Sequence, residues 1–222
     1  MDELLPMKLF PWVRLLYANP DFWNPKLNTL FQKYPELCPY LDIPVQHASP
    51  RILKLMERGY DIQKIKRKLL RLRQDVPTIA LRTSVMVGFP SESDDDFNML
   101  LDFIEDVRFE RLGVFTYSKE EDTRAAQLPD DVPSDEKERR KDIVMQIQWS
   151  IAREFAESKI NQTIDVIIEE NAGEYFSGRS GWDAPEIDCF VRIHSEKALE
   201  IGKFYKVKID SAEELDLVGK VR

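Results

Sequence analysis

Polar residues come directly after an apolar run at residues 39–45, where a strand would end. Gln46 and His47 occupy these positions. In parallel β/α folds the carboxyl ends of strands hold functional groups, because the strands fix the side chains while the loops vary. Gln46 and His47 are therefore candidate ligand-binding residues. The alternative is that they and Ser49 satisfy the strand end and cap the next helix, since a lone histidine without a paired acid is weak support for catalysis.

A second apolar run, residues 78–89, contains Arg82 and ends with Gly88 and Phe89. An arginine in a buried strand is costly unless it is paired, so we expect Arg82 to point into a polar barrel interior. There it could hold a carboxylate through two parallel hydrogen bonds. Gly88 would permit a close backbone approach to a ligand. A structural salt bridge and an ordinary strand-ending turn explain the same residues equally well.

A third candidate segment, residues 178–188, has two glycines, a proline and three acidic residues around a tryptophan. Trp182, Asp183 and Glu186 are predicted to bind a protein substrate, because a tryptophan ringed by carboxylates is a plausible anchor. The alternative is a hairpin loop with Trp182 folded onto its own domain.

The elements that would position these residues follow from periodicity. Apolar runs predict strands at residues 12–17, 39–45, 78–89 and 111–118. Helices are predicted after four capping residues, which are Asn24, Ser49, Asp61 and Ser93. The helix that follows Ser49 is expected to end at Gly59. Buried, continuous strands separated by helices are typical of parallel β-α-β units. Four such units do not close an eight-stranded barrel, so residues 1–133 are predicted to form a partial, open β-α barrel.

The pattern changes in the second half of the chain. Residues 119–133 lose all periodicity and are interpreted as a linker. A long amphipathic helix is predicted over 134–159. In residues 160–222, apolar residues then recur with a period of two, in short runs that are separated by Gly, Asn and Asp. This pattern predicts a small all-β, OB-like barrel.

Composition limits the class of protein. Apolar residues make up 43% and charged residues 32% of the 222, which is typical of a globular protein. No run approaches the length of a membrane span, and the first residues lack the pattern of a secretory signal. Cys38 and Cys189 are too far apart to form a CxxC or CxxxCxxC site, so we expect a reduced, cytoplasmic protein without its own metal ligands.

The charge is concentrated in the predicted barrel. The whole chain carries −8, and residues 160–222 contain 8 basic and 13 acidic residues. A barrel that holds RNA through its phosphates should be basic. The negative net charge of the predicted barrel therefore favours a basic protein partner over nucleic acid.

Several segments together resemble one family. WVRLLYANP, YLDIPVQHAS, LRTSVMVGFPSE, LGVFTYSKEE and GRSGWDAPEID occur in the order found in RimO-type methylthiotransferases. These are radical-SAM enzymes that methylthiolate an aspartate of ribosomal small-subunit protein S-twelve. The resemblance implies a radical-SAM barrel followed by a TRAM domain, with S-adenosylmethionine and 4Fe-4S clusters as cofactors. It also implies that Gln46, His47 and Arg82 line the S-adenosylmethionine or substrate face of the barrel, and that Gly88 lies in the strand-end loop beside the cofactor.

The departures from that family are specific. The cluster-binding CxxxCxxC segment is absent, so the chain resembles about the C-terminal half of such an enzyme and is expected to be inactive alone. Three family glycines are replaced, by Ser91, Asp122 and Cys189, and any of these that needs positive φ would alter its loop. Two other hypotheses stay open: the tRNA-modifying branch, and a non-catalytic module that binds the ribosome.

Without the first barrel strands, the strand near residues 12–17 would lie at a sheet edge. Such an edge has unpaired backbone groups and apolar faces. We expect it to pair with a complementary N-terminal fragment or with a second copy of the chain.

Overall fold

The computed structural model describes residues 3–121 and 123–222, which divide into two compact units. The sheet unit comprises Leu15–Lys33 and Leu41–Ser150, and the barrel unit comprises residues 3–14, 34–40 and 151–222. Asp122 lies outside the described residues. Periodicity placed residues 3–14 and 34–40 in the first domain, whereas their contacts group them with the barrel.

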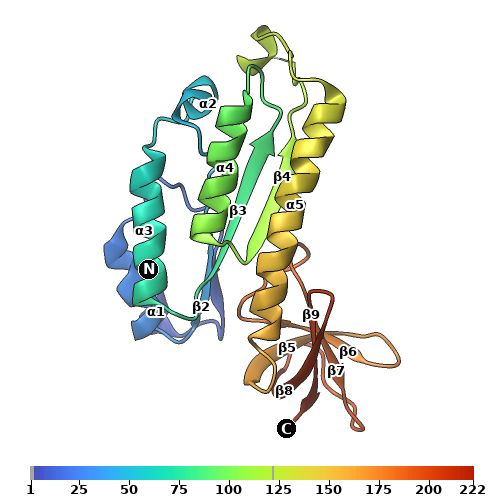
Figure 1. The fold of residues 1–222 in the computed structure, drawn as a ribbon. Helices are drawn as coiled ribbons and strands as arrows, with labels where there is room; N and C mark the ends of the chain where they lie inside the picture. Colours follow the sequence, from blue (N-terminus) through green and yellow to red (C-terminus); the bar gives the residue numbers. More distant parts are fainter. Residues whose placement is uncertain (1–2, 122) are drawn as a thin grey trace. The chain divides into compact units, whose positions relative to one another are not determined.

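A four-stranded sheet organises the first half of the chain (Figure 1). The strands are β1 (Val13–Leu15), β2 (Leu37–Asp42), β3 (Ala80–Val87) and β4 (Arg111–Thr116), in that order across the sheet. β3 and β4 are parallel, with Met86 opposite Phe115. β1 is an edge strand, as predicted. This open sheet with its helices confirms the partial β-α barrel.

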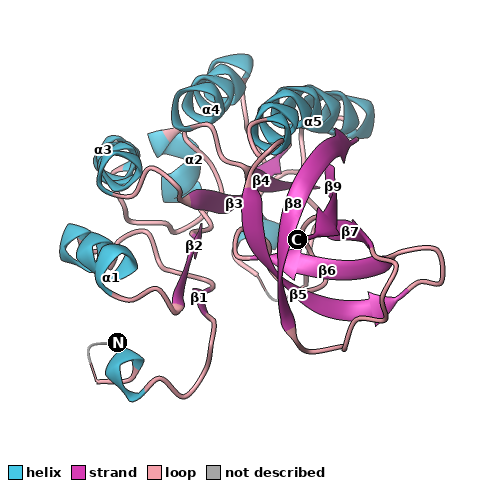
Figure 2. Ribbon diagram, turned by 90° about the horizontal axis from the view of Figure 1, so that it is seen from below, coloured by secondary structure: helices cyan, strands magenta, loops and turns pink. Residues whose placement is uncertain are grey.

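Helices cover the outer side of the sheet; Figure 2 shows α1, α3 and α4 side by side there. They are α1 (Asn28–Lys33), α2 (Pro50–Leu55), α3 (Ile62–Asp75), α4 (Asp94–Val107) and α5 (Ser134–Glu157), with short 3-10 helices at Leu5–Met7, Pro25–Leu27 and Ala125–Gln127. All four predicted caps form, because each side chain accepts a backbone N–H of its first helical turn.

Two local predictions were wrong. The helix that opens at Pro50 ends at Leu55 rather than at Gly59, and Glu57 takes the left-handed conformation (φ +57°) just after it. β3 is not buried throughout: Thr83, Val85 and Val87 are buried, whereas Arg82, Ser84 and Met86 on its other face are only half-buried. Helices cover one face of the strand, and its second face stays partly open.

The second half of the chain forms a closed five-stranded barrel in the order β5-β6-β7-β9-β8. Its strands are β5 (Thr163–Asn171), β6 (Phe176–Ser180), β7 (Val191–His194), β8 (Phe204–Glu213) and β9 (Asp216–Val221). Every pairing is antiparallel except that of β7 with β9. Alternate residues such as Val166, Ile193 and Val207 fill the interior, which confirms the OB-like barrel predicted from the period of two.

Candidate functional site

A cavity of about 320 Å³ lies where polar and apolar side chains follow the carboxyl ends of the sheet strands. Its apolar wall comprises Leu55, Met56, Met86, Phe89, Tyr117 and Ala125, and its polar wall comprises Gln46, Glu57, Arg58, Ser118, Glu120, Thr123 and Arg124. Apolar walls with a few convergent polar groups are typical of small-molecule sites. The cavity is therefore the candidate site of the sheet unit.

Gln46 is the one predicted cofactor-binding residue on the wall of this cavity. Its backbone prolongs the pairing with β3, because its N–H donates to Ser84 O (2.9 Å) and its carbonyl accepts from Met86 N (2.8 Å). Gln46 has φ +62°, an uncommon conformation for a residue with a side chain. Backbone strain of this kind is often retained at ligand sites.

His47, the next residue, is not on the cavity wall. Its side chain has 0% exposure, and Nδ1 accepts a hydrogen bond from the backbone N–H of Ser49 at 2.9 Å. Ser49 in turn caps α2. Of the two explanations for these residues, the structure thus favours the helix-capping one at His47 and Ser49.

Arg82 and Gly88 also lie off the cavity wall. The Arg82 side chain is 15% exposed, with Nε 3.9 Å from Oδ1 of Asp42. Gly88 has φ +69°, and a Cβ built on it would overlap Cγ of Lys137. The side chain of Lys137, from α5, therefore packs directly against Gly88.

Several residues that complete the cavity were not predicted. Glu120, Thr123, Arg124 and Ala125 come from the segment interpreted as a linker, which follows β4 just as the other loops follow their strands. Its position after a strand was the available signal. The segment was interpreted as a linker because it has no periodicity, but an irregular segment can line a site without any repeating pattern.

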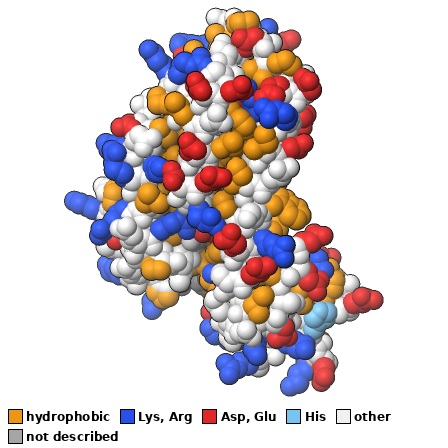
Figure 3. Space-filling view, viewed as in Figure 1, with side chains coloured by type: hydrophobic (Ala, Val, Ile, Leu, Met, Phe, Trp, Pro, Cys, Tyr) orange, Lys and Arg blue, Asp and Glu red, His pale blue; other side chains and the backbone are white. Residues whose placement is uncertain are grey.

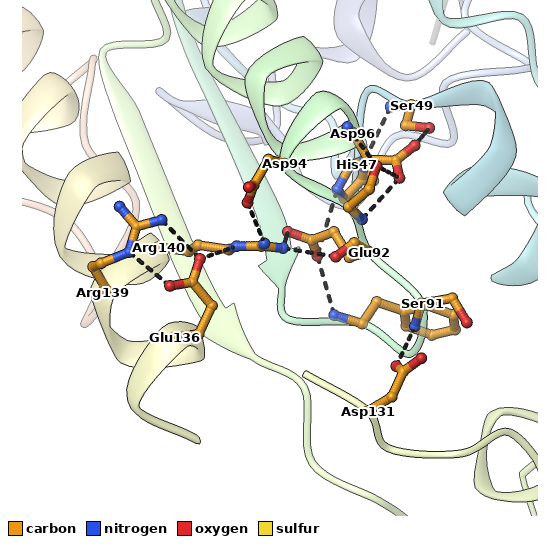
Figure 4. A network of polar contacts seen from close by, with 12 residues as sticks. His47, Ser49, Ser91, Glu92, Asp94, Asp96, Asp131, Glu136, Arg139 and Arg140 are labelled. Atoms are coloured by element: carbon orange, nitrogen blue, oxygen red, sulfur yellow. Dashed lines mark hydrogen bonds and ion pairs between the residues drawn. The ribbon is translucent and has the colours of Figure 1, made fainter. Parts of the chain in front are cut away.

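A buried polar cluster supports the loops beside the cavity (Figure 4). Glu92 has 0% side-chain exposure and pairs with Arg140 of α5 at 2.9 Å. Asp96 accepts hydrogen bonds from Ser49 and Ser93 and pairs with Arg51. Burial alone would raise the pKa of Asp96, but the hydrogen bonds outweigh it and lower that pKa below its usual value.

At Ser91 the resemblance described above implies a glycine, and the backbone there has φ +67°. Its backbone N–H donates to Oδ1 of Asp131 at 2.6 Å, so the turn keeps the left-handed conformation despite the side chain. We expect Ser91→Gly to raise the free energy of unfolding by about 0.5–1 kcal/mol, because relief of the left-handed strain exceeds the added chain entropy. Urea unfolding measures this. Ser118→Gly, where φ is not positive, should not stabilise the chain, and equal effects would contradict the explanation.

Tyr60 anchors the strand end next to Gln46, since its phenol donates to the carbonyl of Val45. Burial raises the pKa of Tyr60 to about 12 from 10.0. The folded chain therefore holds this proton more tightly than the unfolded chain does. The resulting contribution to the free energy of unfolding is present below pH 10 and is lost as the pH rises toward 12. We expect a loss of about 3 kcal/mol over that window, absent in Tyr60→Phe, in urea titrations at each pH.

Tyr17→Phe is the control for that experiment, because the Tyr17 side chain is 79% exposed. It should keep the pH profile of the parent chain. A Tyr60→Phe profile that still falls between pH 10 and 12 would assign the loss to other groups.

The predicted substrate-binding residues lie on the barrel unit. Trp182 is partly buried, with its ring edge-on to Phe155 (centroids 5.9 Å apart) and Nζ of Lys159 4.2 Å from its centroid. Asp183 is buried and accepts a hydrogen bond from the Ser180 hydroxyl. Of these three predicted residues, only Glu186 is exposed. The tryptophan is thus folded onto its own domain, as the alternative explanation expected.

The cysteines do not suit an iron–sulfur cluster, which needs three thiolates at one site. Cys38 is 1% exposed, and burial raises the pKa of its thiol, which disfavours a thiolate. Across residues 3–121 and 123–222, no group of three or more His, Cys, Asp or Glu side chains is placed to hold a metal ion. Over the same residues, no helix is both long and apolar enough to cross a membrane.

Comparison with known proteins gives these features a context. The Radical SAM superfamily profile matches residues 11–104, and the TRAM domain profile matches residues 160–221. The ribosomal protein uS12 methylthiotransferase RimO of Clostridioides difficile is 42% identical over 222 residues, which is 100% of this chain and 50% of the relative. The RimO protein of Desulfitobacterium hafniense is 40% identical over 222 residues, which is again 100% of this chain and 50% of the relative. Over its whole length, the chain is similar to RimO-type methylthiotransferases.

This similarity confirms the resemblance found in the sequence motifs, and the Radical SAM match implies S-adenosylmethionine and 4Fe-4S chemistry for the proteins that share it. The chain spans about half the length of the curated relatives it matches. A solved structure supports the fold: coproporphyrinogen III oxidase of Escherichia coli, a radical SAM enzyme, aligns with TM-score 0.50 at 15% identity over 82% of this chain and 46% of that one.

Proposed function

We propose that this chain is the S-adenosylmethionine-binding and substrate-recognising half of an enzyme that methylthiolates an aspartate of ribosomal protein uS12. The observation that carries the proposal is the 42% identity to a uS12 methylthiotransferase across the whole chain, together with a cavity at the strand ends. The cavity volume, about 320 Å³, lies within the range of small-molecule sites.

The side chains of the cavity suit S-adenosylmethionine. In this family, that cofactor and a 4Fe-4S cluster supply the radical that removes a hydrogen from the target. Phe89, Met86 and Tyr117 would pack against the adenine ring and exclude water from it. Gln46 would orient polar groups through its amide. Glu57 pairs with Arg124 of the same wall, so Glu120 is the acidic residue that would attract the sulfonium charge.

His47, Arg82 and Gly88 were also predicted to face the cofactor, and for them this stays a prediction. Arg82 is the strongest of the three, because its face of β3 is only half-buried and it lies in the same strand as Met86. We propose that Arg82 holds a carboxylate on that open face.

We propose that the cluster ligands lie outside these 222 residues, because Cys38 and Cys189 do not suit a cluster. The chain would then act only with a cluster-bearing polypeptide, and the edge of β1 is the surface that it would pair with. Exposed Leu16, Tyr17 and Phe22 lie next to this edge in the sequence. A monodisperse monomer in sedimentation velocity, with no binding of a hydrophobic dye, would contradict an unpaired apolar edge.

The barrel is the proposed surface for the ribosomal protein, since its residues 160–222 carry 13 acidic and 8 basic side chains. Figure 3 shows acidic and basic side chains interspersed on the face it draws, so the acidic excess there is spread out. Glu186 and Ile187 are exposed in one loop, and Ile187 is 52% exposed. With Trp182 packed inward, this pair replaces it as the proposed contact.

We expect Glu186→Lys to weaken binding of uS12 about three- to fivefold, because one favourable charge contact with a basic partner becomes repulsive. Glu200→Lys makes the same charge change at another exposed position of the barrel unit. Titration of both variants with purified uS12 separates the two cases. An equal loss in both would show that only net charge matters.

The decisive experiment is a titration of the chain with uS12 and, in parallel, with tRNA, each at about 50 and 200 mM salt. Binding to uS12 alone supports the proposal. Tight, steeply salt-dependent tRNA binding would move the chain to the tRNA-modifying branch. Titration with S-adenosylmethionine then separates an enzyme half from a non-catalytic ribosome-binding module, since only the former needs the cofactor.

A further inference from the structure

Glu92, in the loop after β3, is a fully buried carboxylate at the centre of the polar cluster (Figure 4). Its Oε1 accepts from Nη1 of Arg140 at 2.9 Å, and its Oε2 accepts from the backbone N–H of Phe89 at 3.1 Å. On its other side, Nε2 of His47 lies 3.7 Å from Oε2, and both of these side chains have 0% exposure. Glu92 thus joins three separate segments of the chain.

The His47 ring is oriented by its other nitrogen. Nδ1 accepts the N–H of Ser49, so the ring hydrogen is on Nε2 and points toward Glu92. Within the part of the chain that the structure describes, Nε2 has no hydrogen-bond partner. The carboxylate of Glu92 is therefore the acceptor that this buried donor faces.

The two loops joined by Glu92 form adjacent parts of the cavity wall. Gln46, which precedes His47, and Phe89, which donates to Glu92, both line the cavity. The loops also contain left-handed backbone at Gln46, Gly88 and Ser91, with φ between +62° and +69°. At Gln46 and Ser91, which carry side chains, this conformation is strained and persists only where the surroundings hold it, so these loops need an external support.

Arg140 of α5 supplies that support. Its side chain is 5% exposed and uses each of its guanidinium nitrogens. Nη1 donates to the backbone carbonyl of Glu92 (3.0 Å) as well as to its carboxylate, Nε donates to Glu136 (2.7 Å), and Nη2 donates to Asp94 (2.9 Å). A guanidinium held at so many points fixes its partner in one position.

We propose that Arg140, Glu92 and His47 set the spacing between the two loops that wall the cavity. They are positioning residues, because none of them lies on the cavity wall. Arg140 fixes Glu92, and Glu92 holds Phe89 through its backbone and Gln46 through His47. The inference rests on the proposed function only for the choice of S-adenosylmethionine as a probe.

Amide hydrogen exchange of the ligand-free chain tests the proposal directly. In Arg140→Met, we expect exchange at residues 45–49 and 88–93 to become at least tenfold faster, with α3 unchanged. Arg139→Met is the matched control: it is the neighbouring residue on α5, and the hydrogen bonds of its exposed guanidinium go to Glu136. Faster exchange in only the 88–93 loop, or equally throughout the sheet unit, would overturn the proposal.

A second variant keeps the test valid if Arg140→Met does not fold. Arg140→Met combined with Glu92→Gln removes both buried charges, so the chain should fold while the two loops remain uncoupled. Its loops should still exchange faster than those of the parent. Parent-like exchange in this double variant would show that packing alone positions the loops.

His47→Asn isolates the link to the first loop, because the asparagine Oδ1 can replace Nδ1 as acceptor for Ser49 while nothing replaces Nε2–H. We expect it to weaken S-adenosylmethionine binding about five- to tenfold in calorimetry, under conditions where urea unfolding shows that the variant is fully folded. Unchanged affinity would overturn the role of His47. If the parent chain does not bind this probe, the proposed function fails, and the exchange experiment still decides the inference.

The imidazole spectrum provides a readout that a merely structural role would not alter. The chain has only two histidines, so His194→Gln assigns the ¹⁵N signals without ambiguity. We expect Glu92→Gln to shift the Nε2 signal of His47 and to leave that of His194 unchanged. No shift at His47 would show that the 3.7 Å approach carries no interaction.

Discussion

Gly88→Ala should lower the free energy of unfolding of the sheet unit by about 3 kcal/mol. Two costs combine. The backbone at Gly88 has φ +69°, which an alanine adopts only with strain. The new methyl group would also overlap Cγ of Lys137 and lie 3.0 Å from its Cβ. These atoms are close to the α5 backbone, so the side chain cannot swing aside as its far end could.

Lys137 is held at its far end as well. Its ammonium donates to the carbonyl of Tyr117 (3.3 Å) and pairs with Asp130 (2.6 Å), and the residue is 6% exposed. Moving it would therefore break two polar contacts at the end of β4. Urea unfolding followed by far-UV circular dichroism would measure the loss.

Gly173→Ala separates the two costs, since Gly173 also has positive φ (+89°) but no atom lies within 4 Å of where its new methyl group would sit. It should cost about 1 kcal/mol. Adding Lys137→Ala to Gly88→Ala should recover part of the stability by removing the clash. If Gly88→Ala is no worse than Gly173→Ala, the contact with Lys137 is not what requires glycine.

Arg73→Met should cost about 2–4 kcal/mol, because it leaves the buried Glu110 carboxylate without its countercharge. Nη1 and Nη2 of Arg73 donate to the two oxygens of Glu110 at 2.7 and 2.9 Å. Glu110 also accepts the backbone N–H of Leu81 at 2.8 Å, so the pair ties α3 to the start of β3. Chemical unfolding of the variant measures the cost.

The control comes from the same helix. Arg71 pairs with Asp75 at 2.9 Å on the surface, with the arginine side chain 64% exposed, so Arg71→Met should cost less than about 0.5 kcal/mol. Combining Arg73→Met with Glu110→Gln removes the unpaired charge and keeps an acceptor for Leu81, so the double variant should be more stable than Arg73→Met alone. Equal losses in Arg71→Met and Arg73→Met would show that burial of the pair is not what makes it stabilising.

The buried pairs show how this fold positions its candidate site. Glu110 lies at the amino-terminal side of the sheet and Glu92 lies beside the cavity, yet each is held by one arginine from a helix. The first of these pairs contributes to stability alone. The second contacts the loops that carry Gln46 and Phe89, which is why we assign it a role in the site.

Local patterns in the sequence determined most of the architecture. For example, the helical spacing of the apolar residues Ile62, Ile65, Leu69 and Leu72 indicates the buried face of α3, and all four are buried. Capping side chains act over three or four residues, so Ser49 and Ser93 could be assigned without a structure. The alternation of the last 60 or so residues similarly predicted the barrel. The resemblance to RimO-type methylthiotransferases followed from motif strings, and the comparisons confirmed that resemblance.

What only the tertiary structure decided depends on contacts between residues far apart in the sequence. Glu92 and Arg140 are 48 positions apart, and no local pattern marks either as the partner of the other. The same holds for Gly88 and Lys137, and for the irregular segment at 123–125 that completes the cavity. The sequence by itself thus determined the elements and the fold class, because periodicity and capping are local, and its motifs carried the resemblance to a known family. Which side chains face the cavity, and which are buried behind it, was decided only when distant segments came together.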